Sequence, residues 1–464
     1  MKIKSVKLRS FVIVALLAIG LMIAGCQQPE QPATTPGETP TEEFAGTIYI
    51  GYSGPLSGGA ALYGQNNLQG IQYAVEDINE HGGVEIAGKK YKLEVVSADD
   101  KYSPALTIPN AEKMLEMYNT PVIFCPHSGG VLALEKINEE RGFIIGAYTS
   151  SPAILQGGNK HIFQIPPNFE LVYVPFLSNV FLEKGIKRAA TMEGTHEYGV
   201  LWGEKFKEYW TSKGGEIVAE APVNYYTETD FTTHLQKVLA ADPEVILVVG
   251  PSEPIANLIK TARDMGYKGG FLVAEQAKIE EIMHFLGIEY DFATKTVKKG
   301  DLSLLDKTAG TSAPEALVKL PEVTSDYRNQ VITQDPLIEG YKVTVSRIKE
   351  RLGDYPVTWE HALEYQAMMV LAKAIDEADS LDPDAIMDAM ENEVWPMDGY
   401  MGVPNYIYSQ LLRAAPWDTR GALNTPGSAL VIWDGEVTGY IEIYPKFWGQ
   451  EYYYTDASGN KVWG

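Results

Sequence analysis

Strand-like and helix-like patterns alternate along this chain, and no other feature of the sequence limits its fold as strongly. A short β run at 47–52 precedes a helix whose apolar residues recur at helical spacing as far as Ile78, and Gly82-Gly83 ends it. Further strands are expected at 91–96, 121–125 and 143–147, with helices at 104–118 and 131–140. This rhythm is typical of right-handed βαβ units around a mostly parallel sheet.

A second series of the same kind begins near Pro166. Its strands are expected at 188–192, 216–221, 245–249 and 271–274, and its helices at 171–184, 198–213, 231–240 and 253–265. About 420 residues follow the N-terminal leader and tether, which is too many for one core. The sequence therefore predicts an α/β fold with two doubly wound parallel-sheet lobes.

The C-terminal part of the chain is less regular. Residues 281–327 are polar and show no clear periodicity, whereas 359–378 is expected to form a long helix. The remaining predicted features are β stretches at 429–433 and 439–444, a turn beginning Asp434-Gly435 between them, and loops with short elements at 394–426.

The first 26 residues predict export. Four basic residues precede an apolar run at 11–22, which is shorter than the about 20 residues that a bilayer-spanning helix needs. The run ends in Ile23-Ala24-Gly25-Cys26, which resembles a bacterial lipobox and implies that Cys26 is lipidated. The alternative is an ordinary signal peptide with a cysteine by chance, and both interpretations place the chain outside the cytoplasm. Residues 27–45 are rich in Pro, Thr, Glu and Gln and predict a flexible tether.

Charge and cysteine content exclude several classes of partner and site. The net charge is −23, and it becomes −27 once the four basic residues of the leader are removed. Phosphate binding needs a basic face, so no nucleic acid is expected as a partner. With Cys26 lipidated, Cys125 is the remaining cysteine, and its apolar neighbours predict a buried strand thiol. No CxxC or HExxH spacing occurs, so neither a metal nor a disulfide is predicted.

Two motifs resemble catalytic signatures and are better explained as structure. Residues 83–89 match a phosphate-binding loop until Lys90 stands in place of Ser or Thr, and the stretch precedes a strand, so a hairpin turn is expected. Residues 346–349 match SxxK without its partner motifs, so a surface helix is expected. No GxSxG motif occurs, and we expect no enzymatic activity.

Polar, glycine-bearing loops follow the carboxyl ends of several predicted strands, where open α/β sheets bind ligands. Ser128 and Gly129 precede the helix at 131–140, so they are candidates to hold an anion. The alternative is that Ser128 only caps that helix.

An ordered series of short matches resembles the leucine/isoleucine/valine-binding protein family. It opens with IYIGYSGPLSG at 48–58, Tyr63-Gly64 and AVEDIN at 74–79. It continues with Ser128 after Pro126, TSSP at 149–152, Tyr198-Gly199, Thr229-Asp230-Phe231 and ARDMG at 262–266. The resemblance is good from Thr47 to about Gln276, vague over 281–327, and weak afterwards.

This resemblance implies a type I periplasmic-binding fold, in which two lobes joined by a three-crossing hinge close on a ligand. It implies an N-terminal lobe of residues 46–165 plus 328–424, and a C-terminal lobe of residues 166–327 plus 425–464.

The resemblance also implies site residues. Ser128, with Gly129, and Ser150 match hydroxyl-bearing positions that grip the ligand, Ala147 or Tyr148 would supply a carbonyl, and Tyr63 and Tyr198 would line the pocket. Glu275 matches the acid that binds an α-ammonium group, with a solvated helix-cap acid as its alternative. The chain departs from the family at Cys125-Pro126-His127 and in its greater length.

The function that follows is the substrate-binding component of an ABC importer. Its expected ligand is an amino acid with a branched-chain or other apolar or aromatic side chain, and its expected partners are permease subunits. The pocket needs no cofactor and no metal, and the only membrane attachment expected is the lipid anchor. Alternative ligands are an aromatic or aliphatic carboxylate, an amide or urea. An alternative role is that of a ligand sensor for a separate signalling partner.

Overall fold

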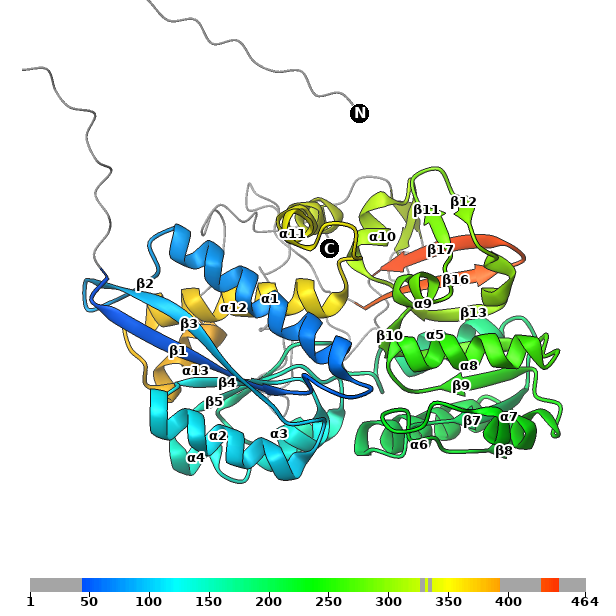
Figure 1. Ribbon diagram of the computed structural model, residues 1–464, viewed down its shortest axis with the longest axis horizontal. Coiled ribbons are helices and arrows are strands. Elements are labelled where there is room, and N and C mark those ends of the chain that lie inside the picture. The colour runs from blue at the N-terminus through cyan, green and yellow to red at the C-terminus, as the bar shows by residue number, and fades with distance from the viewer. Residues whose placement is uncertain (1–43, 326–329, 333–335, 393–426, 442–464) are drawn as a thin grey trace, which may run out of the picture. The chain divides into compact units, whose positions relative to one another are not determined.

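Two large sheets and one two-stranded sheet organise the part of the chain that the structure describes, namely residues 44–325, 330–332, 336–392 and 427–441 of a computed structural model (Figure 1). Within these residues, no helix combines the length and the apolar character needed to cross a bilayer.

The first sheet has the strand order β2-β3-β1-β4-β5-β6 and is parallel except for β2. Its strands are β1 (Gly46–Gly54), β2 (Val84–Ile86), β3 (Lys89–Asp99), β4 (Val122–Cys125), β5 (Ile144–Ala147) and β6 (Ile162–Gln164). Strands β2 and β3 form the hairpin expected at 83–89, and its turn residues Ala87 and Gly88 both have positive φ. Positive φ at both central residues is typical of a type I′ hairpin turn.

Helices cover both faces of the first sheet. Figure 1 shows α1 (Ala61–Glu80) and α12 (Trp359–Ala378) on one face, and α2 (Pro104–Tyr118), α3 (Ser128–Leu134) and α4 (Asn138–Arg141) on the other. Alternation along β4 explains this arrangement, because Phe124 packs in the core cluster with α1 and α12 while Cys125 packs in the cluster with α2 and α3. The thiol of Cys125 is buried, as predicted.

The second sheet has the order β15-β14-β17-β16-β13-β10-β9-β7-β8. Its parallel part consists of β7 (Arg188–Met192), β8 (Glu216–Glu220), β9 (Val245–Val248), β10 (Gly270–Lys278) and β13 (Thr308–Thr311). The strands added beside β13 are β14 (Val323–Ser325), β15 (Gln330–Ile332), β16 (Ser428–Trp433) and β17 (Glu436–Ile441), and most of these pairings are antiparallel.

The helices after β6 are α5 (Tyr173–Leu182), α6 (Glu197–Ser212), α7 (Thr232–Leu239), α8 (Ser252–Asp264), α9 (Ile279–Phe285), α10 (Pro314–Lys319), α11 (Pro336–Leu352) and α13 (Pro383–Asn392). Side chains alternate along β9, where Ile246 packs with α7 and α8 and Leu247 with α5 and α6. The second sheet is therefore also covered on both faces, and the predicted α/β class with two doubly wound sheets is confirmed.

Two sequence expectations need correction. The helix expected at 131–140 is two short helices, and the first starts at Ser128 because the His127 ring accepts the backbone N–H of Gly130 (3.0 Å). The strand expected at 271–274 continues to Lys278, with an irregular register after Val273. That continuation adds the polar side chains of Glu275, Gln276 and Lys278 to the strand.

The irregular stretch at 281–327 contains several short elements. They are the end of α9, the hairpin of β11 (Glu289–Asp291) and β12 (Thr296–Lys299), the 3₁₀ helix η2 (Leu302–Leu305), β13, α10 and β14. Elements this short give little periodic signal, which is why sequence patterns missed them. The stretch at 394–426 lies outside the described residues, so the expectation of loops and short elements there stays a prediction.

Most other C-terminal expectations are confirmed, whereas the strand expected at 439–444 is β17 and starts earlier, at Glu436, with 442–444 outside the described residues. Helix α12 covers 359–378, and β16 and β17 are joined by Asp434-Gly435, both with positive φ. The SxxK stretch lies in α11, where Ser346 is exposed, as expected for a surface helix.

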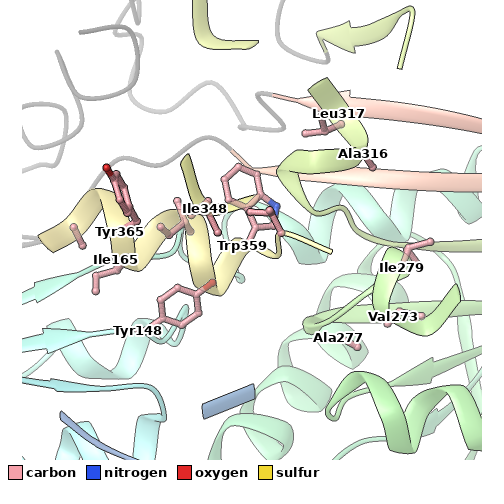
Figure 2. Close-up of a cluster of buried hydrophobic side chains, with 14 of the residues drawn as sticks. Tyr148, Ile165, Val273, Ala277, Ile279, Ala316, Leu317, Ile348, Trp359 and Tyr365 are labelled. Carbon is pink, nitrogen blue, oxygen red and sulfur yellow. The ribbon is translucent and has the colours of Figure 1, made fainter. Parts of the chain in front are cut away.

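Helix α12 connects the two sheets through polar contacts in its first half. Near its start, the Trp359 indole donates to Ser428 Oγ on β16 (2.6 Å). Nearly two turns further along, the Tyr365 hydroxyl donates to Asp77 on α1 (2.5 Å), and Asp77 also pairs with Arg351 of α11. Figure 2 shows Trp359 between Tyr148, which follows β5 of the first sheet, and Ile279, which follows β10 of the second sheet. All three residues belong to one apolar cluster.

We expect Asp77→Asn to destabilise the protein by about 2 kcal/mol. The nearly buried Asp77 carboxylate contacts Tyr365, Arg347 and Arg351, and removing its charge leaves the two arginines without this anion. The matched control is Glu76→Gln, whose 57% exposed side chain pairs with the same Arg351 and should change stability by less than about 0.5 kcal/mol. Urea unfolding of both variants measures the difference, and equal effects would contradict the proposed role of Asp77.

Candidate ligand-binding site

The carboxyl ends of strands from both sheets meet at one cavity. It is enclosed by the loops after β3, β4, β5 and β6, strand β10, the end of β13 and the starts of α1, α5, α6 and α12. Its free volume is about 30 Å³, room for about two water molecules, so the walls lie close together. The aromatic lining consists of Tyr63, Tyr102, Tyr148, Tyr173, Tyr198 and Trp359. The polar lining consists of His127, Thr149, Ser150, Glu275, Gln276, Lys278 and Thr311.

A pair of hydroxyl groups lies at the first sheet's edge of this site. Ser128 Oγ and Thr149 Oγ1 are 2.7 Å apart, and both side chains are buried. Gln164 holds the Thr149 loop in place by donating to the Thr149 carbonyl (2.7 Å). One hydroxyl hydrogen lies within the pair, and the other is available to an oxygen of a ligand.

Glu275 is the buried acid of the cavity. It lies on β10 with 8% of its surface exposed, and its carboxylate accepts hydrogen bonds from the Ser150 hydroxyl and from the Trp202 indole (2.7 Å). Burial raises the pKa of Glu275, and hydrogen bonds from Ser150, Tyr198 and Trp202 oppose that rise. Its placement differs from that of a solvated helix-cap acid.

Backbone carbonyls near β5 are already partly used. The Ala147 carbonyl accepts the Ile165 N–H (2.9 Å) within the sheet. The Tyr148 carbonyl receives only a long contact from the Tyr63 hydroxyl (3.5 Å), whose main acceptor is the Pro126 carbonyl (2.8 Å). Of the two candidate carbonyls, the geometry favours Tyr148.

Aromatic rings from both sheets close one side of the cavity. Tyr102 stacks on His127 (4.6 Å between ring centroids) and on Tyr226 (4.3 Å). Gln276 donates to the hydroxyl groups of Tyr226 (2.8 Å) and Tyr102 (3.3 Å). Tyr102 has a positive φ of 61°, and Asp100 stabilises that turn by accepting its N–H (3.0 Å). Tyr102 therefore joins loops of the two sheets across the site.

Asp100, Cys125 and His127 place an oxygen, a sulfur and a nitrogen within 4.8 Å of one another. The His127 ring accepts the Gly130 N–H at Nδ1, so its proton must lie on Nε2, which donates to Asp100 (2.9 Å). Ser53 and Thr107 also donate to Asp100 (3.1 Å each). This trio is a satisfied hydrogen-bond network, and a metal at Nε2 would need an imidazolate.

The cavity also borders a buried ion pair. Lys278 on β10 pairs with Glu360 on α12, and their side chains are 2% and 1% exposed. The Lys278 ammonium lies 5.7 Å from the centre of the Tyr63 ring. One turn along α12, Glu364 is fully buried, neither of its oxygens has a partner among the described residues, and burial raises its pKa well above the usual range.

The sequence-predicted site residues are mostly brought together. Tyr63, Tyr148, Ser150, Tyr198 and Glu275 line the cavity, and Ser128 contacts it through Thr149. The two that do not line it are Gly129, which faces Pro104 and Glu197, and Ala147, whose carbonyl is used in the sheet.

Sequence reasoning missed several lining residues. Thr149 lies between two predicted site residues, Tyr148 and Ser150, but was not itself predicted. His127 was noted only as a departure from the family pattern. Gln276 and Lys278 were missed because β10 continues beyond its apolar run, and Trp359 because it belongs to a distant helix. Their polar character within or next to buried segments was the available signal.

Comparison with known proteins gives a consistent result. The family model described as periplasmic binding protein matches residues 47–286. An amino acid binding protein of Pseudomonas aeruginosa is 24% identical over 51% of this chain, which spans 62% of that relative. A leucine-, isoleucine-, valine-, threonine- and alanine-binding protein of the same species is 23% identical over 75% of this chain and 82% of the relative.

The fold agrees with a solved structure as well. The substrate-binding protein of a branched-chain amino acid transporter from Streptococcus pneumoniae, in complex with isoleucine, has a TM-score of 0.64 and 18% identity. The match covers 86% of this chain and all of that one (100%). The type I periplasmic-binding fold expected from the resemblance is confirmed.

Glu280, two residues after Lys278, supplies a pH prediction. Burial raises its pKa from 4.5 to about 8, although Ala313 N–H and Ser312 Oγ–H donate to it. The folded chain thus keeps a proton that the unfolded chain releases, so stability falls as pH rises from 4.5 to about 8. Glu280→Gln should reduce this slope by up to about 1.4 kcal/mol per pH unit in urea unfolding. The exposed control Glu289→Gln should keep the wild-type slope, and an unchanged slope in Glu280→Gln would contradict the prediction.

Proposed function

This chain belongs to the periplasmic binding protein family, and from that premise we propose that it is the substrate-binding receptor of an ABC importer and captures a free amino acid. Glu275 is the observation that carries the proposal. A carboxylate buried among tyrosines needs a cationic partner, and an α-ammonium group is a partner of the right charge and size.

The two ends of an amino acid have separate places in this cavity. The α-ammonium group would bind Glu275 and the Tyr148 carbonyl, whereas the α-carboxylate would accept from the Ser128–Thr149 hydroxyl pair. Ser150 lies between these places and donates to Glu275, which orients the carboxylate. The Tyr198 hydroxyl faces Glu275 inside the cavity and would take a further ligand contact.

The ligand would be enclosed by two lobes, with the boundaries 46–165 plus 328–424 and 166–327 plus 425–464. The packing of α12 on α1 and the pairing of β16 with β13 support this division. Contacts that join the lobes, such as Ser150 with Glu275 and Asn66 Nδ2 with Glu281 (2.9 Å), would break when the lobes open.

Capture without chemical turnover is the role that fits this site. Family members are solute-binding proteins, and Glu275 has donors around it instead of a nucleophile–base pair. Permease subunits are the proposed partners of the loaded form. The aromatic hydroxyl lining is also compatible with a carboxylate that lacks an amine, and the titration below distinguishes that ligand from an amino acid.

We propose further that the leader directs export, that Cys26 carries lipid, and that 27–45 tethers the folded part to the membrane facing the periplasm or the cell exterior. Residues 1–43 lie outside the described part of the chain.

Glu275→Gln should weaken the binding of amino acids by about 10- to 100-fold, because the neutral amide loses the charge-assisted bond to the ammonium group. Isothermal titration of the purified full chain with amino acids and with the corresponding acids that lack the amine measures this. The exposed control Glu253→Gln should bind like wild type. Tighter wild-type binding of the acids without the amine would contradict the amino-acid proposal and favour a carboxylate ligand.

Cys26→Ser should release the chain from the membrane fraction, because the thiol that takes the lipid is absent. Detergent partitioning of wild type and variant measures this, and unchanged membrane retention of the variant would contradict the lipid anchor.

A further inference from the structure

The lining of the cavity contains little aliphatic surface for a ligand's side chain. Leu363 is its one aliphatic residue apart from three prolines, and the other lining residues are aromatic or polar. Because five of the aromatic residues are tyrosines, even the ring surface carries hydroxyl groups. A branched apolar side chain would therefore meet polar atoms on most sides.

Lys278 presents a donor that the protein does not fully use. Its ammonium group carries three N–H bonds, and its acceptors among the described residues are Glu360 and the Gln276 carbonyl (3.4 Å). The side chain is 2% exposed and lines the cavity, so a ligand that fills the cavity leaves the third N–H without an acceptor unless the ligand supplies one. An oxygen on the ligand's side chain would satisfy it.

Gln276 presents the complementary group. Its amide nitrogen is used by Tyr102 and Tyr226, but its Oε1 is buried and has no donor among the described residues. The side chain is 6% exposed and lines the same cavity. A ligand group that donates hydrogen bonds would satisfy this oxygen.

The charges around the site decide whether the ligand's side chain is ionised. Glu360 already neutralises Lys278, and Glu275 is reserved for the ammonium group. A side-chain carboxylate would add a negative charge to a region where Glu360 and Glu364 are both buried. An uncharged group avoids that cost and still offers an acceptor for Lys278.

We propose that Lys278 and Gln276 are specificity-determining residues that select an amino acid with an uncharged amide side chain over one with a branched apolar or acidic side chain. The amide oxygen would accept from Lys278, and the amide nitrogen would donate to Gln276. This inference rests on the proposed function, since it takes the backbone of the ligand to be held by Glu275 and by the Ser128–Thr149 pair.

The test uses ligands of matched shape. Asparagine, leucine and aspartate differ in side-chain polarity and charge at nearly constant size, and glutamine, methionine and glutamate form the same series one methylene longer. Isothermal titration of the full chain in detergent should give, in at least one series, an amide that binds at least about tenfold more tightly than its two analogues.

Lys278→Met removes the ammonium group and keeps the length of the side chain. It should weaken binding of the preferred amide by about tenfold or more and should leave the apolar analogue unchanged or tighter. Because this variant leaves Glu360 without its cation, the double variant Lys278→Met with Glu360→Gln provides a folded alternative with the same expected change in ligand order. Lys260→Met, at a 58% exposed position, is the control and should keep the wild-type order.

The outcomes separate the two proposals. If leucine or methionine binds wild type as tightly as its amide, or if the acidic analogue binds most tightly, the selection for an amide is wrong while the amino-acid receptor stands. If the Lys278 variants keep the wild-type ligand order, the role of Lys278 is wrong. If none of the six amino acids binds, the selection proposed here is wrong, and a response only to acids without an amine would overturn the proposed function as well.

Discussion

A buried carboxylate is the interaction on which this site depends. Glu275 lies on the extended end of β10, away from solvent, with the Ser150 hydroxyl and the Trp202 indole as its donors. Neutral donors do not balance a buried negative charge, so burial raises the pKa of Glu275. A ligand ammonium group supplies the missing charge. Ligand binding and the ionisation of Glu275 are therefore coupled in this account.

The surrounding fold places that carboxylate opposite the hydroxyl pair. Parallel strands end at one edge of each sheet, so β4 and β5 bring Ser128 and Thr149 to one side of the cavity and β10 brings Glu275 to the other. Helix α12 contributes Trp359 and Glu360, which link it to Ser428 and Lys278 of the second sheet. The same contacts that enclose a ligand thus also hold the two sheets together.

Much of this arrangement follows from sequence patterns. The alternation of strands and helices, the Ala87-Gly88 and Asp434-Gly435 turns and helix α12 were all predictable from periodicity and turn chemistry. The extension of β10 to Lys278 was not, because polar residues in a buried strand are stabilised by tertiary contacts such as the pair with Glu360. Tyr102 was missed for a similar reason, since its backbone conformation depends on Asp100.

The most direct test of the coupling is the number of protons released when the ligand binds. Titration calorimetry at about pH 5, in buffers of different ionisation enthalpy, measures that number, because the ordinary carboxyl pKa of 4.5 is raised in free Glu275. We expect the wild-type chain to release protons on binding and Glu275→Gln to lose this release. Binding without proton release by the wild type, or equal release by both chains, would contradict it.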